Sequence, residues 1–258
     1  MFCEVDARFT KVVWGPMKGL ILAAGRGSRL NELTEIQPKC FLQIHGRPLI
    51  EWQLSSLRES GVSPIGIVTG YKSDYLNGFG DTRIHNDKWS RTNMVESLLC
   101  ADKWLSSDTC IVSYSDILYQ NSAVIDLQSC DDDVAIAYDP NWLKLWSKRF
   151  VDPLSDAESF SLNEHGYLTS IGSKCTSIDG IQGQFMGLIK ITPVGWRSLK
   201  KVITSQAESV RSSLQVTGLL SELVKSELGK VACIPYFDTW MEIDSATDFE
   251  IAIKLDFS

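Results

Sequence analysis

Short apolar runs alternate with amphipathic segments along the first half of the chain. The apolar runs have the length and composition of buried strands, and they occupy residues 20–24, 65–69, 109–114 and 133–138. Between them, apolar positions recur every three or four residues, which predicts helices at residues 47–60 and 94–105. Strands and helices that alternate in this way indicate an α/β fold with a Rossmann-like, mostly parallel central sheet and helices on both faces.

The second half of the chain contains a looser region. Polar residues predominate from about residue 140 to 177, which suggests a lid or a substrate-binding insertion. The strands and helices expected after it lie at residues 187–191, 198–205, 216–227, 230–234 and 245–254. We therefore predict one domain over residues 17–258, with residues 138–195 as its substrate-binding or lid subregion. Residues 1–16 have no clear period and are expected to form an extension before the domain.

Composition and charge narrow the range of functions. The 258 residues are 44% hydrophobic and 22% charged, which is typical of a globular chain with a full core. The net charge of −7 argues against a nucleic-acid partner, because an acidic surface repels a polyanion. The apolar runs are far shorter than the ~20 residues that cross a membrane, and no signal peptide is visible. We expect a cytoplasmic protein that does not bind a membrane.

The cysteines and histidines do not indicate a disulfide framework or a zinc site. Seven cysteines form an odd set without a CxxC pair, and the three histidines lie far apart in the sequence. We expect reduced thiols that fill the core.

A glycine-rich turn follows the first predicted strand. Residues 22–30 read Leu-Ala-Ala-Gly-Arg-Gly-Ser-Arg-Leu, and Pro38-Lys39 follows further along the chain. Small residues let backbone N–H groups approach a phosphate or a base, since no Cβ stands in the way. Arg29 and Lys39 add positive charge. Leu30 occupies the third glycine position of the dinucleotide pattern GxGxxG, so that pattern is not met, and neither is the P-loop pattern.

This turn, with Pro38-Lys39, resembles the signature of MobA-like and sugar nucleotidyltransferases, which join a nucleoside triphosphate to a phosphorylated small molecule and release pyrophosphate. The resemblance runs from Met17 to the C-terminal helix and implies a fold of the nucleotide-diphospho-sugar transferase type. It also implies that Lys39, Arg29 and Asp116 are catalytic. The nucleotide-binding residues that it implies are Leu22, Ala23, Ala24, Gly25, Arg26, Gly27, Lys39, Gly70, Asn93, Ser97 and Ser115.

Other strings point to one branch of these enzymes. Residues 68–72, 86–98 and 113–119 look like cytidylyltransferases that act on phosphocholine or on phosphonates such as 2-aminoethylphosphonate. This branch implies CTP as the nucleotide and a small phosphonate or phosphomonoester as the acceptor. Gln184 stands where phosphonate enzymes of the branch often carry glutamate, so the acceptor stays open. An NTP:sugar-1-phosphate nucleotidyltransferase and a non-catalytic regulatory subunit of the same fold are the alternatives, and a homo-oligomer is compatible with either.

Two aspartates follow strand-like segments. Asp116 comes after the strand at 109–114, and the carboxyl ends of parallel strands border the ligand crevice. Asp244 precedes a predicted helix, where an N-cap is its alternative role. Mg²⁺ on a nucleoside triphosphate needs few protein oxygens and keeps several waters. The resemblance gives Asp116 and Asp244 the metal-binding role and makes Mg²⁺ the expected cofactor.

Tryptophans and carboxylates in the second half suggest the acceptor site. Aromatic faces beside carboxylates bind ammonium groups through cation–π and charge attraction, although packing in the core is the alternative role of each tryptophan. Trp146 and Asp238 are candidates for such a cationic pocket. The residues that we expect to bind the acceptor are Asp139, Trp142, Gln184, Gly187, Trp240 and Glu242.

Overall fold

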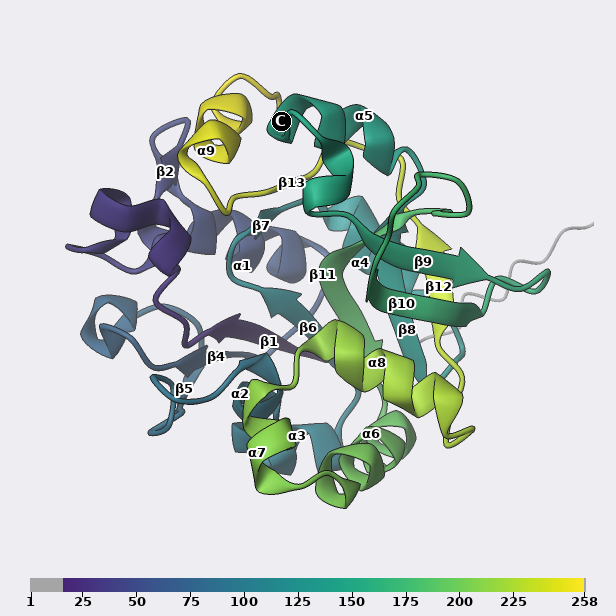
Figure 1. Cartoon of the computed structure of the whole chain (residues 1–258). Helices are drawn as coiled ribbons and strands as arrows, with labels where there is room; N and C mark the ends of the chain where they lie inside the picture. The colour runs from purple at the N-terminus through teal and green to yellow at the C-terminus, as the bar shows by residue number, and fades with distance from the viewer. Residues whose placement is uncertain (1–15, 258) are drawn as a thin grey trace, which may run out of the picture.

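A seven-stranded sheet forms the centre of the computed structural model, which describes residues 16–257 (Figure 1). Its strands are β1 (Lys18–Ala23), β4 (Ile65–Thr69), β5 (Thr82–His85), β6 (Cys110–Tyr114), β8 (Val134–Asp139), β11 (Gln184–Ile191) and β12 (Ala232–Pro235). They lie in the order β12-β8-β11-β6-β1-β4-β5. Only β11 runs antiparallel to its neighbours β6 and β8 among these seven strands, so the sheet is mostly parallel.

Helices cover both faces of this sheet, as the sequence predicts (Figure 1). On one face, α1 (Leu49–Glu59) packs against α4 (Asn121–Gln128). The helices of the other face are α2 (Met94–Cys100), α3 (Asp102–Ser107), α6 (Pro193–Ser205), α7 (Glu208–Ser213) and α8 (Val216–Lys225). The Rossmann-like α/β class is confirmed. No helix among the described residues has the length and apolar character needed to span a membrane.

Three predicted helix boundaries are wrong. The helix expected at 94–105 is two helices, because Ala101 ends α2 and begins α3. The helix expected from residue 47 begins at Leu49, since Arg47–Pro48 forms a short strand, β3, paired with β2 (Gln43–Ile44). The third helix, α6, begins at Pro193 instead of 198, because the Thr192 side chain accepts a hydrogen bond from Gly195 N and caps it.

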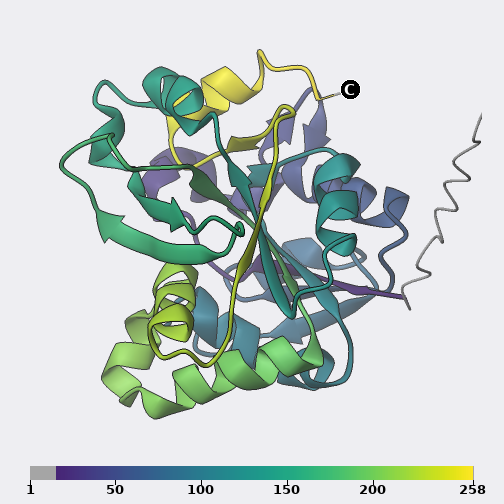
Figure 2. The ribbon, with the colours of Figure 1, turned by 90° about the vertical axis from the view of Figure 1, so that its right-hand side faces the viewer.

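The region from 140 to 177 is more regular than its polar composition suggests. It contains α5 (Trp142–Arg149), the short 3-10 helix η4 (Pro153–Ser155), and the antiparallel hairpin of β9 (Glu158–Leu162) and β10 (Leu168–Lys174). The hairpin buries few side chains, Phe160, Leu168 and Ile171, which explains its weak apolar signal. It stands beside the sheet, with β10 against α8 (Figure 2). The extension predicted for residues 1–16 lies, apart from Pro16, outside the described residues.

A small second core holds two distant segments together near the carboxyl ends of β1 and β6. Within it, β13 (Met241–Glu242) pairs antiparallel with β7 (Ile117–Leu118), and Leu118, Met241 and Ile243 are buried. The backbone N–H of Ile243 donates to the carbonyl oxygen of Asp116 at 2.9 Å. Because of this pairing, the chain just before β7 and the chain just after β13 lie side by side. Asp116 and Asp244 occupy those two positions.

Candidate active site

The glycine-rich turn after β1 is held in place from both sides. The carbonyl oxygen of Ala24 accepts a hydrogen bond from Tyr71 N at 2.9 Å, which ties the turn to the end of β4. Gly27 has a φ of +68°, a conformation that side chains disfavour. A Cβ at Gly27 would also lie 3.0 Å from Cδ of Lys39. The glycine therefore allows the lysine side chain to pass directly behind the turn.

Lys39 joins two carboxylates at the bottom of this turn. Its Nζ lies 2.7 Å from Oδ2 of Asp116 and hydrogen-bonds to Oδ1 of Asp244, and its side chain is 8% exposed. Burial alone would lower the pKa of Lys39, but the charges of Asp116 and Asp244 outweigh burial and raise that pKa. Burial would raise the pKa of Asp244, and Lys39 reverses this shift. The contacts between Lys39 and the two aspartates therefore favour the charged forms of Lys39 and Asp244.

The same carboxylates meet the requirements of a divalent cation. Asp116, Glu242 and Asp244 each offer an oxygen, and these oxygens lie within 4.8 Å of one another. Oδ1 of Asp116 is buried and has no hydrogen-bond partner among the described residues. Burial, and then the charge of Asp244, raises the pKa of Glu242 to about 8. An all-oxygen set with a crowded carboxylate fits a hard cation such as Mg²⁺.

A cavity of about 240 Å³ lies between the glycine-rich turn and the start of α2. Among the residues predicted to bind nucleotide or metal, its lining includes Leu22, Ala24, Gly25, Gly27, Arg29, Lys39, Asn93, Ser97, Ser115, Asp116 and Asp244. Ala23, Arg26 and Gly70 do not line it. Ala23 points into the core, Arg26 is exposed over the ring of Tyr71, and Gly70 lies behind the turn.

Residue-by-residue prediction missed several lining residues. Asn86, Trp89, Thr92, Met94 and Tyr114 face this cavity. They lie in or beside the segments whose resemblance suggested the branch, and the amide of the buried Asn86 donates to Oγ of Ser97 at 3.2 Å. The resemblance of these segments was the signal available in the sequence, because the burial of Asn86 and its hydrogen bond depend on the fold.

We expect Gly70→Ala to disturb the turn and weaken nucleotide binding. A Cβ at Gly70 would lie 2.5 Å from Cβ of Trp89 and 2.6 Å from the carbonyl oxygen of Ala24, so one of them must move. Overpacking of this kind costs about 1–3 kcal/mol in the free energy of unfolding. Thermal unfolding and the KM for the nucleotide measure the effect. Gly25→Ala is the control for stability, because a Cβ there meets nothing within 4 Å. Equal melting temperatures for the two variants would contradict the expectation.

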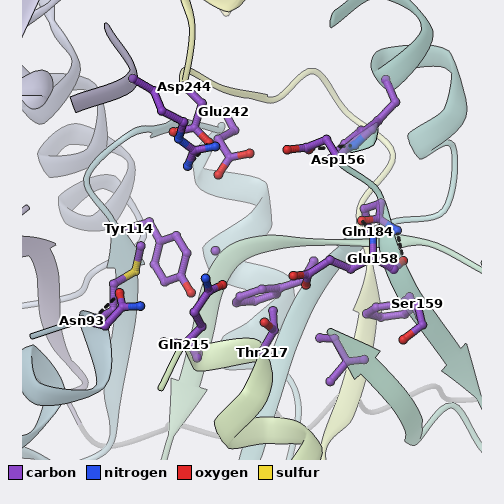
Figure 3. Close-up of a pocket in the computed structure, with 18 residues that line it drawn as sticks. Asn93, Tyr114, Asp156, Glu158, Ser159, Gln184, Gln215, Thr217, Glu242 and Asp244 are labelled. Carbon is purple, nitrogen blue, oxygen red and sulfur yellow. Dashed lines mark hydrogen bonds and ion pairs between the residues drawn. The ribbon is translucent and has the colours of Figure 1, made fainter. Parts of the chain in front are cut away.

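A second cavity, of about 370 Å³, opens beside the first (Figure 3). The two cavities share a wall, because both are lined by Arg29, Asn93, Met94, Tyr114 and Asp244. Of the residues predicted to bind the acceptor, Gln184, Gly187 and Glu242 line the second cavity, together with Trp146.

The second cavity is not lined by the other three residues predicted to bind the acceptor, Asp139, Trp142 and Trp240. All three are buried, and Nε1 of Trp240 donates to Oδ2 of Asp139 at 2.9 Å. Nε1 of Trp142 donates to the carbonyl oxygen of Ile181 at 3.2 Å. Asp139 and Trp240 border a separate surface groove next to α5, together with Asp238. The rings of Trp142 and Trp240 each lie 6.1 Å from that of Trp146, so the three predicted tryptophans are neighbours. Trp142 and Trp240 nevertheless pack in the core with satisfied N–H groups, and of the three only Trp146 lines the second cavity.

The fold, the glycine-rich turn and the lysine between two aspartates are consistent with a nucleotidyltransferase. The model of the MobA-like NTP transferase domain matches residues 19–166, more than half of the chain. The chain belongs to this family.

Several proteins that are similar to this chain are cytidylyltransferases. The chain is 32% identical to CTP:phosphoglutamine cytidylyltransferase of Campylobacter jejuni, over 92% of this chain and 100% of that protein. It is 37% identical to choline-phosphate cytidylyltransferase of Streptococcus pneumoniae, over 41% of this chain and 47% of that protein. The structure of inositol-1-phosphate CTP transferase of T. maritima matches with a TM-score of 0.71 at 23% identity, over 93% of this chain and 96% of that one. This match confirms the nucleotide-diphospho-sugar transferase type of fold.

Proposed function

We propose that this protein is a cytidylyltransferase that joins CMP from CTP to a small phosphonate or phosphomonoester and releases pyrophosphate. The observation that carries the proposal is the position of Lys39, Asp116 and Asp244 beside the cavity of the glycine-rich turn, where a second cavity adjoins. A full-length relative that is a cytidylyltransferase supports the choice of CTP. Two adjoining cavities suit a nucleotide and an acceptor that react at their common wall.

The reaction requires alignment and charge stabilisation more than proton transfer. An oxygen of the acceptor phosphate or phosphonate is already ionised near neutral pH, so no general base is required. This oxygen attacks the α-phosphorus of CTP, a new P–O bond forms, and the bond to the bridging oxygen breaks. Pyrophosphate leaves with the electron pair. Lys39 and Arg29 line the cavity assigned to the nucleotide, and in this proposal their charges stabilise the oxygens of the α-phosphate and of the leaving group.

Asp116, Asp244 and Glu242 would hold the Mg²⁺ that we propose as cofactor. When bound, the ion supplies positive charge against the triphosphate. Asp248 contributes to the position of these ligands, because its Oδ2 accepts hydrogen bonds from the backbone N–H groups of Asp244 and Ser245 at 3.0 and 2.9 Å. The segment that carries Asp244 is thereby fixed before substrates bind.

A pyrophosphate-release screen tests the proposal. Four nucleoside triphosphates are crossed with phosphocholine, 2-aminoethylphosphonate, phosphoglutamine and sugar 1-phosphates. We expect CTP to give the highest kcat/KM, and excess EDTA to abolish turnover until Mg²⁺ is restored. Preference for UTP or ATP with a sugar 1-phosphate would instead favour a sugar-phosphate enzyme. Full activity in EDTA would contradict the metal site. No pyrophosphate from any pair would favour a regulatory subunit.

A further inference from the structure

The second cavity is rich in negative charge. Asp156 and Glu158 line it in addition to Glu242 and Asp244, and Figure 3 shows the side chains of Asp156, Glu158 and Glu242 around one space. Arg29 is the one lysine or arginine among the described lining residues. It makes an ion pair with Oδ2 of Asp244 at 2.9 Å. The positive charge is therefore on the side of the nucleotide cavity, and the opposite end carries carboxylates.

Among the described residues, Asp156 and Glu158 lack a cationic side chain in direct contact, although the more distant charges of Arg149 and Arg29 lower the pKa of Asp156 in part and a hydrogen bond from Thr217 does so for Glu158. No lysine, arginine or histidine within the described part of the chain forms an ion pair with either side chain. Asp156 accepts one hydrogen bond, from Nε1 of Trp146 at 3.1 Å. Burial raises the pKa of both carboxyl groups, so their charged forms are costly without a partner. A cation that enters the cavity would compensate for this cost.

Gln184 fixes the position of Glu158. Its Nε2 donates to the carbonyl oxygen of Glu158 at 2.6 Å and to that of Gly183 at 2.9 Å. Its Oε1 accepts from the backbone N–H of Glu158 at 3.1 Å. The amide is thus engaged on both sides with backbone, and it joins the start of β9 to β11. Gln184 therefore acts as a positioning residue for Glu158, and not as a free hydrogen-bond donor for an acceptor hydroxyl.

Aromatic side chains complete the wall of this cavity. Tyr114 and Phe185 line it with their rings edge to face at 5.8 Å, and Trp146 lies beside Asp156. Carboxylates together with aromatic faces favour an ammonium group, whether primary or quaternary, over a neutral group of the same size.

We propose that the acceptor of this enzyme carries an ammonium group, which binds at Asp156 and Glu158 while its phosphate or phosphonate lies toward Arg29. The inference rests on the proposed cytidylyltransferase function and adds the chemical class of the acceptor. It places the ammonium site at Asp156, which directly follows η4, and at Glu158, the first residue of β9.

Pairs of acceptors that differ only in charge test the inference in the wild-type enzyme. Phosphocholine is compared with its carbon isostere, 3,3-dimethylbutyl phosphate, and phosphoethanolamine with propyl phosphate. We expect at least one ammonium acceptor to exceed its neutral partner about tenfold or more in kcat/KM, a difference that a desolvated cation site readily provides. Equal values within both pairs would overturn the inference while leaving the cytidylyltransferase reaction intact. No turnover of CTP with any acceptor would instead overturn the proposed function.

Charge-neutral variants locate the site. Asp156→Asn and Glu158→Gln are expected to raise the KM for the ammonium acceptor about tenfold and the KM for the neutral isostere much less. Glu164→Gln is the matched control, because Glu164 lies in the exposed turn between β9 and β10, with its side chain 85% exposed. An equal loss with charged and neutral acceptors, or a loss with the control, would overturn the assignment. If a variant does not fold, the wild-type comparison still decides.

Discussion

Replacement of Lys39 by methionine is expected to lower kcat by about 10²–10³-fold, because a preorganised charge at the transferring phosphate stabilises the transition state more than the ground state. Methionine keeps most of the side-chain volume that packs behind Gly27. The loss of rate then reports the ammonium group, which lies 2.7 Å from Asp116. Single-turnover measurement of pyrophosphate release separates this step from product release.

Lys201→Met provides the control for the Lys39 experiment. Lys201 is exposed on α6 and lines neither cavity, so its loss should leave turnover unchanged. Near-normal turnover in a folded Lys39→Met variant would remove the lysine from the mechanism. A fall in turnover for both variants would show that the effect does not depend on the position between Asp116 and Asp244.

Local signals explain why the nucleotide side of the site could be predicted. The turn at residues 24–30 directly follows β1, and Lys39 lies close in sequence, so one segment contains most of the residues that we propose bind phosphate. Asp116 follows β6 at the carboxyl edge of the sheet, where ligands of parallel sheets bind. Asp244 could be predicted as a partner of Asp116 only from the family resemblance, because the closeness of the two residues depends on the pairing of β13 with β7.

The lining of the second cavity could be predicted only in part, because its contacts are made between distant segments. Gln184, Gly187 and Glu242 line it as expected, whereas Asp139, Trp142 and Trp240 do not. Trp142 and Trp240 are aromatic residues of the kind that line cation pockets. Packing between α5 and the sheet, however, buries them with their N–H groups satisfied. Asp156 and Glu158 lie in a stretch without clear periodicity. Their approach to Tyr114 and Glu242 follows from the placement of the hairpin, which no local pattern encodes.

A buried ion pair connects the stability of the fold to the segment that carries Glu242 and Asp244, the proposed metal ligands. Nε of Arg149 lies 2.8 Å from Oδ1 of Asp248, and the two side chains are 0% and 1% exposed. Nη2 of Arg149 also reaches Glu242 at 3.2 Å, and the guanidinium lies over the ring of Trp146. Because Asp248 in turn binds the backbone of Asp244, the arginine holds the segment that carries the carboxylates of the site.

We therefore expect Arg149→Met to lower the free energy of unfolding by about 3–5 kcal/mol, since removal of one partner leaves the charge of Asp248 buried and unpaired. Urea unfolding followed by tryptophan fluorescence measures the change. Lys148→Met, on the exposed face of the same helix, should change stability by less than about 0.5 kcal/mol. The double variant Arg149→Met with Asp248→Asn should recover part of the loss, because the buried charge is then gone. A loss below about 1 kcal/mol for Arg149→Met would mean that water or rearrangement satisfies Asp248, and that the ion pair does not hold the segment of Glu242 and Asp244 in place.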